Sequence, residues 1–265
     1  MIFKNAENED FFLQQGYVKL PFISEKGLEN IIELFKKTDE NSGLESMFYT
    51  SIWSNNQEYK KMVDQELKRI LKPFLDKHLK DYQTVFANFM VKKAGASSSL
   101  QPHQDWTFVK EPEHYSITIW IPLMDVAKNN GALEVLPGSN KLENYIRARF
   151  MDSPFSAHNE YIKEELMKSI PVKRGEALLV NSRTIHASPD NLSGKDRIVA
   201  SIVVCPQSTP MVHYVLMEGS KLERLIVDQN FYVKYSCFDK PSNKVDCSIS
   251  NLEFEPLTLR ELTSL

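Results

Sequence analysis

Two histidines and an aspartate are spaced as ligands for one metal ion. His103 and Asp105 are separated by one residue, and alternate residues of a β-strand point to the same face of a sheet. His186 follows a second predicted strand, which ends at Asn181. A set of two histidines and one carboxylate leaves positions open on Fe(II) for O2 and a cosubstrate. The sequence therefore predicts a non-haem iron centre at His103, Asp105 and His186.

A cation follows the last of these ligands along the chain. Arg197 opens a predicted strand and shares one face of it with Ser201. A guanidinium beside a hydroxyl can bind a carboxylate through two hydrogen bonds. A metal-bound 2-oxo acid with a second carboxylate needs such a partner at its far end. The ordinary alternative for His186 is a core or turn histidine, and that for Arg197 is a surface ion pair. The order of the two residues in the chain and their strand-compatible spacing disfavour both alternatives.

The same histidine-to-carboxylate spacing occurs once more, at His158 and Glu160. Those residues fall in a segment with helical character, where residues two apart point in different directions. We expect them to lie on a solvated surface and to bind no metal.

The elements that must position these residues change in character along the chain. Ser24 can cap a helix whose apolar residues have helical spacing: Leu28, Ile31, Ile32 and Phe35. Residues 58–79 predict a second helix that Pro73 should kink or split. From residue 83, short β-rich runs alternate with turn signals, which favours an antiparallel sandwich or barrel. The predicted strands are 84–92, 100–108, 116–123, 132–136, 176–181 and 198–205, with a helical insertion at 156–168. The strand at 116–121 alternates, so its isoleucines should face the helices and its polar side chains and Trp120 the interior.

Several segments resemble the phytanoyl-CoA dioxygenase family of Fe(II)/2-oxoglutarate oxygenases. They are residues 11–24, His-Gln-Asp at 103–105, Asn-Gly-Ala-Leu-Glu-Val-Leu-Pro-Gly-Ser at 130–139, and 175–197, within a resemblance that covers about residues 10–206. The resemblance implies a β-rich α+β fold, a double-stranded β-helix or jelly roll with N-terminal helices packed on one sheet. It also implies that His103, Asp105 and His186 ligate iron.

By the same resemblance, Arg197 holds the distal carboxylate of 2-oxoglutarate, Ser188 assists it and Trp120 lines the cosubstrate pocket. The facing of the strands adds Thr118 and Ser201 to this cofactor-binding set.

The reaction implied by the resemblance is hydroxylation of an unactivated C–H bond in a small-molecule metabolite or natural-product intermediate. It consumes 2-oxoglutarate and O2 at Fe(II) and releases succinate and CO2, and desaturation or cyclisation stays open. The alternatives are a cupin-type metalloenzyme that does not use 2-oxoglutarate and a non-catalytic jelly-roll binding module. A zinc hydrolase is a further, weaker alternative, since three protein ligands also suit zinc.

The substrate is left open by the sequence. Arg147 and Arg149 could meet a carboxylate or phosphate, or could form a solvated basic rim. The candidate pocket residues are Asn88 and Met90 (or Phe89 and Val91 in the shifted register), Gln101, Trp106, Phe108, Tyr145, Arg147, Arg149 and Phe150.

Composition narrows the class of protein. The 265 residues carry 32 Lys+Arg and 35 Asp+Glu, a net charge of −3, which disfavours nucleic-acid and polybasic membrane partners. Three cysteines and an acidic N-terminus without an apolar leader favour a reducing, cytoplasmic setting. We expect one domain over 1–265, with the oxygenase jelly roll at 10–206. The extension at 207–265 is unassigned: a lid, extra strands or the surface of a homodimer would each fit.

Overall fold

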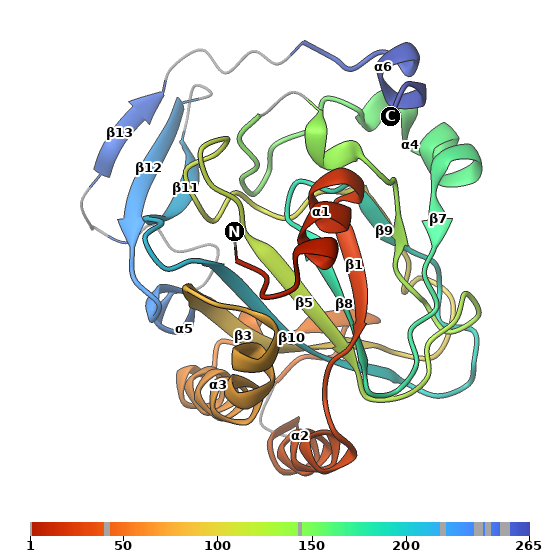
Figure 1. The fold of residues 1–265 in the computed structure, drawn as a ribbon, viewed down its shortest axis with the longest axis vertical. Helices are drawn as coiled ribbons and strands as arrows, with labels where there is room; N and C mark the ends of the chain where they lie inside the picture. The colour runs from red at the N-terminus through yellow and green to blue at the C-terminus, as the bar shows by residue number, and fades with distance from the viewer. Residues whose placement is uncertain are drawn as a thin grey trace.

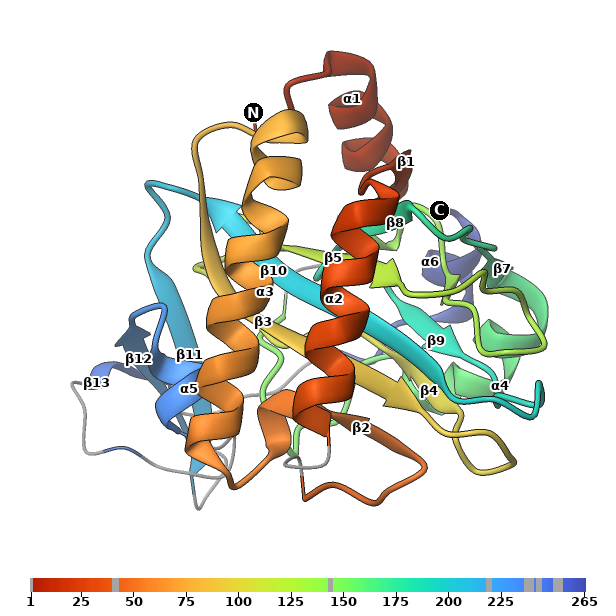
Figure 2. The same cartoon turned by 90° about the horizontal axis from the view of Figure 1, so that it is seen from below.

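Two long helices near the N-terminus lie side by side against one face of the main sheet (Figure 2). Ser24 caps α2 (Glu25–Thr38) by accepting a hydrogen bond from the backbone N–H of Gly27, as predicted. α3 (Gln57–His78) runs on through Pro73, so that proline does not split the helix. Leu67, Leu71 and Leu75 lie on both sides of the proline and are buried in one core, which favours a single helix. A shorter helix, α1 (Ala6–Gln15), precedes them.

The computed structural model describes residues 2–39, 43–142, 145–217, 221–235, 241, 245–249 and 255–265.

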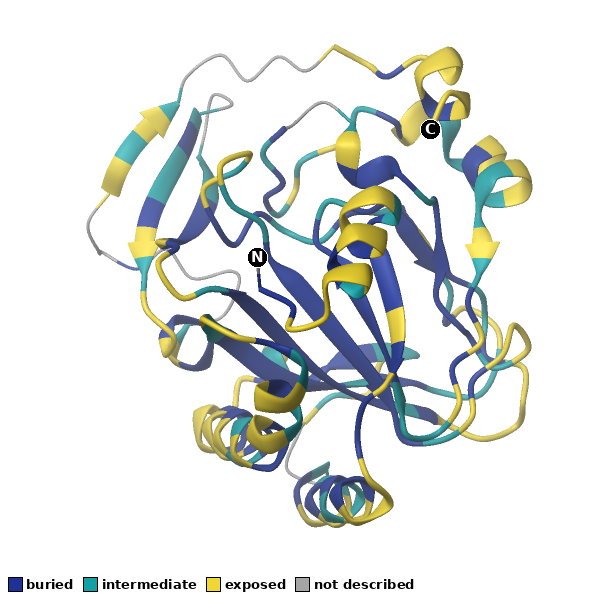
Figure 3. Cartoon of the chain, in the orientation of Figure 1, coloured by how far each residue is buried: buried dark blue, intermediate teal, exposed yellow. Residues whose placement is uncertain are grey.

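The main sheet has six antiparallel strands and is almost wholly buried (Figures 1 and 3). Their spatial order is β1-β8-β5-β10-β3-β2. β10 lies inside the sheet and pairs with β5 on one side and β3 on the other. The strands are β1 (Tyr17–Pro21), β8 (Glu176–Asn181), β5 (Ile117–Pro122), β10 (Arg197–Pro206), β3 (Tyr82–Lys92) and β2 (Phe48–Thr50).

A smaller antiparallel sheet faces the inner side of the main sheet. Its order is β4-β9-β6-β7, and its strands are β4 (Leu100–His103), β9 (His186–Ser188), β6 (Glu134–Val135) and β7 (Lys168–Ser169). An apolar cluster that includes Val135 from β6 and Trp120, Leu178 and Val199 from the main sheet lies between the two layers. The predicted strand at 100–108 is wrong beyond His103, where β4 ends and an irregular segment begins.

The two faces of the main sheet divide the side chains of β5 as the sequence predicts. Ile117, Ile119 and Ile121 pack under α2 and α3, whereas Trp120 points into the space between the sheets. On β3, Phe89 joins the helix-side core and Met90 packs on the inner cluster. The observed register therefore places Asn88 and Met90, not Phe89 and Val91, on the inner face.

Residues beyond β10 add a third antiparallel sheet beside the first two, at the left of Figure 1. It comprises β11 (Met211–Met217), β12 (Lys221–Val227) and β13 (Val245–Ile249), and the short α5 (Phe231–Lys234) packs with it on the segment around Phe108. The backbone N–H of Val212 donates to the carbonyl of Phe108 over 2.8 Å. Of the three possibilities for the extension, extra strands are observed.

The remaining elements are short. The predicted insertion is a helical stretch of η4 (Ser156–His158), α4 (Asn159–Tyr161) and η5 (Ile162–Leu166), and α6 (Leu259–Thr263) ends the chain. Cys205 and Cys247 are free thiols, and Cys237 lies outside the described residues. Across the described ranges, no helix combines the length and apolarity needed to cross a bilayer.

Candidate metal centre and anion subsite

The three predicted metal ligands lie together at the edge of the smaller sheet. His103 ends β4, His186 begins β9, and the two residues pair directly across the strands. Asp105 lies just past the end of β4, and its Oδ1 is 3.8 Å from His186 Nε2. One ligand atom from each of the three side chains lies within 4.8 Å of the other two. This arrangement of two nitrogens and one oxygen can hold a divalent cation such as Fe(II).

Hydrogen bonds orient both imidazole rings. His103 Nδ1 lies 2.7 Å from the carbonyl oxygen of Gln101, and His186 Nδ1 lies 2.9 Å from that of Thr184. A carbonyl only accepts, so each Nδ1 carries the proton and each Nε2 presents a lone pair. Removal from water and the neighbouring His186 lower the pKa of His103 to about 4, which keeps this imidazole neutral and able to bind a metal.

The carboxylate of Asp105 is held from the opposite sheet. Thr118, on the inner face of β5, donates its hydroxyl to Asp105 Oδ2 over 2.6 Å. One carboxylate oxygen is thereby fixed, and Oδ1 is the oxygen nearer to His186. Thr118, predicted as a cofactor-binding residue, thus contacts a metal-ligand candidate.

A buried guanidinium lies at the start of β10. Arg197 is 2% exposed, and its Nη1 donates to the carbonyl of Gly131. Its guanidinium carbon is 5.2 Å from the centre of the Trp120 ring, while Nε has no hydrogen-bond partner. No carboxylate in the described part of the chain forms an ion pair with it, and burial lowers its pKa to about 9. A buried cation without a counter-ion suits an anionic ligand, because a paired charge is far less costly to bury.

Lys92 brings a second buried cation to this subsite and was missed from the sequence. It pairs with Arg197 across β3 and β10 and is fully buried. Its Nζ donates to Ser188 Oγ over 2.6 Å and to the Pro189 carbonyl over 2.6 Å. Burial and the neighbouring Arg197 lower the pKa of Lys92 to about 7. Ser188 lies two residues beyond His186 and contacts Lys92, which pairs with Arg197. It therefore lies between the metal-ligand candidates and the two cations.

Further polar atoms face the interior from the middle of the main sheet. Ser201 on β10 pairs with Asn88 on β3 and Trp120 on β5. Ser201 Oγ and Asn88 Oδ1 are buried and have no hydrogen-bond partner. Two such atoms on neighbouring strands leave hydrogen-bonding capacity for a ligand or a water between the sheets.

A cavity of about 230 Å³ opens beside His103. Its wall is the segment 145–153, so it contains four of the predicted pocket residues besides Trp106: Tyr145, Arg147, Arg149 and Phe150. Gln101 and Phe108 do not line it. Gln101 is exposed on β4, and Phe108 is buried against Phe86 and Tyr232. Asn88 and Met90 lie on the sheet face instead.

Arg147 does not form the basic rim expected from the sequence. Its side chain is 6% exposed, and its guanidinium forms a two-pronged ion pair with Glu111, which is 1% exposed. The charge of Arg147 is thus already compensated within the protein, which removes the reason for expecting it to bind a substrate anion. Glu111 was missed because nothing in its local sequence indicates burial.

Structural comparison shows which known proteins share this fold. The chain matches the non-heme alpha-ketoglutarate-dependent carbocyclase SnoK from nogalamycin biosynthesis with a TM-score of 0.56 and 20% identity, covering 78% of this chain and 86% of that one. It matches HygX from Streptomyces hygroscopicus, solved with nickel and 2-oxoglutarate bound, with a TM-score of 0.55 and 14% identity over 77% and 88% of the two chains.

Sequence comparison finds relatives over a shorter stretch. The "Phytanoyl-CoA dioxygenase 1" of Oryza sativa subsp. japonica is 30% identical over 120 residues, 44% of this chain and 42% of that protein. The "Phytanoyl-CoA dioxygenase domain-containing protein 1" of Danio rerio is 28% identical over 118 residues, 42% and 40% of the two chains. The match thus spans about two-fifths of the length of these curated relatives. The phytanoyl-CoA dioxygenase family model matches residues 29–199, which include all three metal-ligand candidates and Arg197. The chain belongs to the phytanoyl-CoA dioxygenase family.

Proposed function

We propose that this protein is an Fe(II)- and 2-oxoglutarate-dependent dioxygenase that hydroxylates an unactivated C–H bond of a small molecule. Its products besides the alcohol are succinate and CO2. The observation that supports this most strongly is the buried Arg197, which has no carboxylate partner among the described residues and is linked through Lys92 and Ser188 to His186. Fe(II), 2-oxoglutarate and O2 are the cofactors used in this family.

Each part of the site has a separate task in this proposal. His103, Asp105 and His186 hold the iron. Arg197 binds the distal carboxylate of 2-oxoglutarate, and Ser188, fixed by Lys92, donates its hydroxyl to the same group. When bound, the iron and cosubstrate supply the oxidising chemistry, and the protein contributes coordination geometry and orientation.

The inner face of the main sheet encloses the cosubstrate in this proposal. Trp120 forms one wall, and Ser201 offers a hydroxyl without a partner. The two facing sheets are the halves of a jelly roll. The TM-scores above 0.5 to 2-oxoglutarate-dependent enzymes support that assignment.

The substrate proposed is a small-molecule metabolite or a natural-product intermediate. A cavity of about 230 Å³ accommodates a small group, and its wall combines Trp106 and Phe150 with Arg149. Two structural neighbours are named as a carbocyclase and an epimerase from nogalamycin biosynthesis, so the proposal also includes outcomes other than hydroxylation.

The test is an anaerobic titration with Fe(II) and then 2-oxoglutarate. The proposal predicts the weak visible charge-transfer band of a chelated 2-oxo acid, and succinate when O2 and candidate substrates are added. Iron binding without the band would favour a cupin-type enzyme that does not use 2-oxoglutarate. Absence of iron binding would favour the non-catalytic module, and preference for zinc with hydrolysis would favour the zinc hydrolase.

The affinity for 2-oxoglutarate should depend on pH through Lys92. With the pKa of Lys92 lowered to about 7, its ammonium loses its proton as the pH rises above that value. A bound carboxylate favours the charged amine, so binding takes up a proton and affinity should fall about tenfold between pH 7 and 9. Lys92→Met should bind 2-oxoglutarate more weakly at pH 7 and show a much shallower profile over this range, with the remaining fall towards pH 9 due to Arg197. The measurement is calorimetry on the metal-loaded protein. An equally steep profile in Lys92→Met would contradict this role.

Three broader predictions concern the whole chain. The packing of α5 and β11 on the Phe108 segment supports one domain over 1–265. A cytoplasmic location and a homodimer formed through residues 207–265 stay predictions, which fractionation and light scattering would test.

A further inference from the structure

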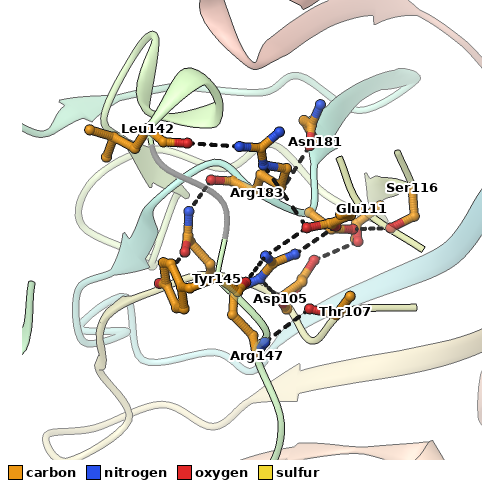
Figure 4. A network of polar contacts seen from close by, with 12 residues as sticks. Asp105, Thr107, Glu111, Ser116, Leu142, Tyr145, Arg147, Asn181 and Arg183 are labelled. Atoms are coloured by element: carbon orange, nitrogen blue, oxygen red, sulfur yellow. Dashed lines mark hydrogen bonds and ion pairs between the residues drawn. The ribbon is translucent and has the colours of Figure 1, made fainter. Parts of the chain in front are cut away.

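A buried ion pair between Arg147 and Glu111 contacts the backbone of Asp105, the carboxylate residue among the metal-ligand candidates (Figure 4). Arg147 donates from both terminal nitrogens to the two carboxylate oxygens of Glu111, each over 2.8 Å. Both side chains are almost fully excluded from solvent. A pair with this geometry holds its two partners in fixed positions.

The third guanidinium nitrogen of Arg147 reaches the metal-ligand segment. Its Nε donates to the backbone carbonyl of Asp105 over 2.7 Å. The backbone N–H of Arg147 donates to Thr107 Oγ1 over 2.9 Å, and the Thr107 N–H donates to the Arg147 carbonyl over 3.0 Å. Because β4 ends at His103, these bonds replace the ladder that would otherwise hold residues 105–107.

A second set of contacts fixes Gln104, which lies between His103 and Asp105 in the chain. The Tyr145 hydroxyl and the side-chain oxygen of Gln104 are hydrogen-bonded, and the Gln104 amide donates to the carbonyl of Arg183. Arg183 lies in the turn before His186, and its Nη2 donates to the carbonyl of Leu142 over 2.7 Å. The network thus joins the segments that carry Asp105 and His186 to Leu142 and to residues 145–147.

The segment that carries Arg147 also forms the cavity wall. Residues 145–153 line the cavity beside His103, and Ala148 packs on Val212, Tyr214 and Leu222 of the C-terminal sheet. One side chain of this wall, Arg147, therefore contacts the metal-ligand segment, while its neighbours face the space proposed for substrate.

We infer that Arg147, anchored by Glu111, is a positioning residue that sets the place of the Asp105 carboxylate and ties it to the wall of the substrate cavity. This inference rests on the proposed metal centre. In this inference Arg147 holds Asp105 in place and does not bind a substrate anion.

Arg147→Lys tests the inference with the charge retained. A lysine can pair with Glu111, but a single ammonium cannot reproduce a fork that binds Glu111 and the Asp105 carbonyl together. We expect the affinity for Mn(II), measured by electron paramagnetic resonance, to fall about 10- to 100-fold, as for other partners that orient metal ligands. The spectrum of bound Mn(II) should also change.

Arg147→Met leaves the buried Glu111 carboxylate with Arg183 Nε, 4.0 Å from its Oε2, as the remaining cationic partner, so this variant can fail to fold for a reason unrelated to the metal. The double variant Arg147→Met/Glu111→Gln removes both charges, and it should fold and show the same loss of Mn(II) affinity. Arg69→Met, which breaks the exposed pair with Glu66, is the matched control and should bind Mn(II) as the parent does.

The outcomes separate the inference from the proposed function. If the parent binds Mn(II) and the folded Arg147 variants bind it with unchanged affinity and spectrum, the positioning role is wrong and the metal centre stands. If the parent binds no Mn(II), with or without 2-oxoglutarate, both are overturned. A lower melting temperature with unchanged Mn(II) binding would mark Arg147 as structural and contradict the inference.

Discussion

Arg197→Met is expected to weaken 2-oxoglutarate binding strongly and to leave the metal-free protein folded. Losing one partner of a buried, hydrogen-bonded charge pair costs about 2–5 kcal/mol of binding free energy, which is roughly 30- to several thousand-fold in affinity. In the absence of ligand, Arg197 has no carboxylate partner within the described residues, so its removal also removes the cost of burying a charge.

Arg197→Met should lose affinity for 2-oxoglutarate without losing thermal stability. We expect the melting temperature of the metal-free protein to stay the same or rise. We also expect the stabilisation by 2-oxoglutarate that the proposal predicts for the parent to disappear. Arg174→Met, which breaks a more exposed pair with Glu25, serves as the control that keeps ligand stabilisation. A variant that is strongly destabilised without ligand, or that keeps its affinity for 2-oxoglutarate, would refute the role given to Arg197.

His186→Ala should reduce the affinity for Fe(II) by at least about 100-fold. Loss of a residue that merely orients a ligand costs about 10- to 100-fold in metal affinity, and loss of the ligand itself should exceed that. The remaining His103 and Asp105 provide one nitrogen and one carboxylate. Anaerobic titration with Fe(II), followed by the charge-transfer band with 2-oxoglutarate, measures both losses in one experiment.

His158→Ala is the matched control for this prediction. His158 belongs to the second histidine-to-carboxylate spacing, but it lies in a helical stretch and is not one of the three clustered metal-ligand candidates. It should bind Fe(II) like the parent. Equal affinity in the parent and in His186→Ala would place the metal elsewhere.

The clustering of the three metal-ligand candidates could be predicted because the relevant information is local. The spacing of His103 and Asp105, and the strand starts near His186 and Arg197, are readable from alternation and turn residues. The strand expected to carry Asp105 was extended too far. Beyond His103 the backbone is bonded to Arg147 instead: the Asp105 carbonyl accepts from Arg147 Nε, and the Thr107 N–H donates to the Arg147 carbonyl. No short-range pattern reveals a partner so distant in the chain.

Lys92 shows a signal that was present and unused. Once Asn88 and Met90 face inward, strand alternation places Lys92 on the same face, next to Arg197. Lysine is rarely buried, so its charge argued for solvent exposure more strongly than alternation argued for burial. Glu111 and the C-terminal sheet carry no comparable signal, because their burial depends on contacts with segments far away in sequence.

The strand order also determines when the protein can fold during synthesis. β1 pairs with β8, and β10 inserts between β5 and β3, so in the described chain β2 and β3 are the sole neighbours in the main sheet that are also consecutive in sequence. At typical translation rates, β1 leaves the ribosome on the order of ten seconds before β8. Such distant pairings close slowly. The nascent chain must therefore protect α1 and β1 from aggregation until β8 appears. The candidate metal centre and the proposed anion subsite form late, after His186 and Arg197 have emerged.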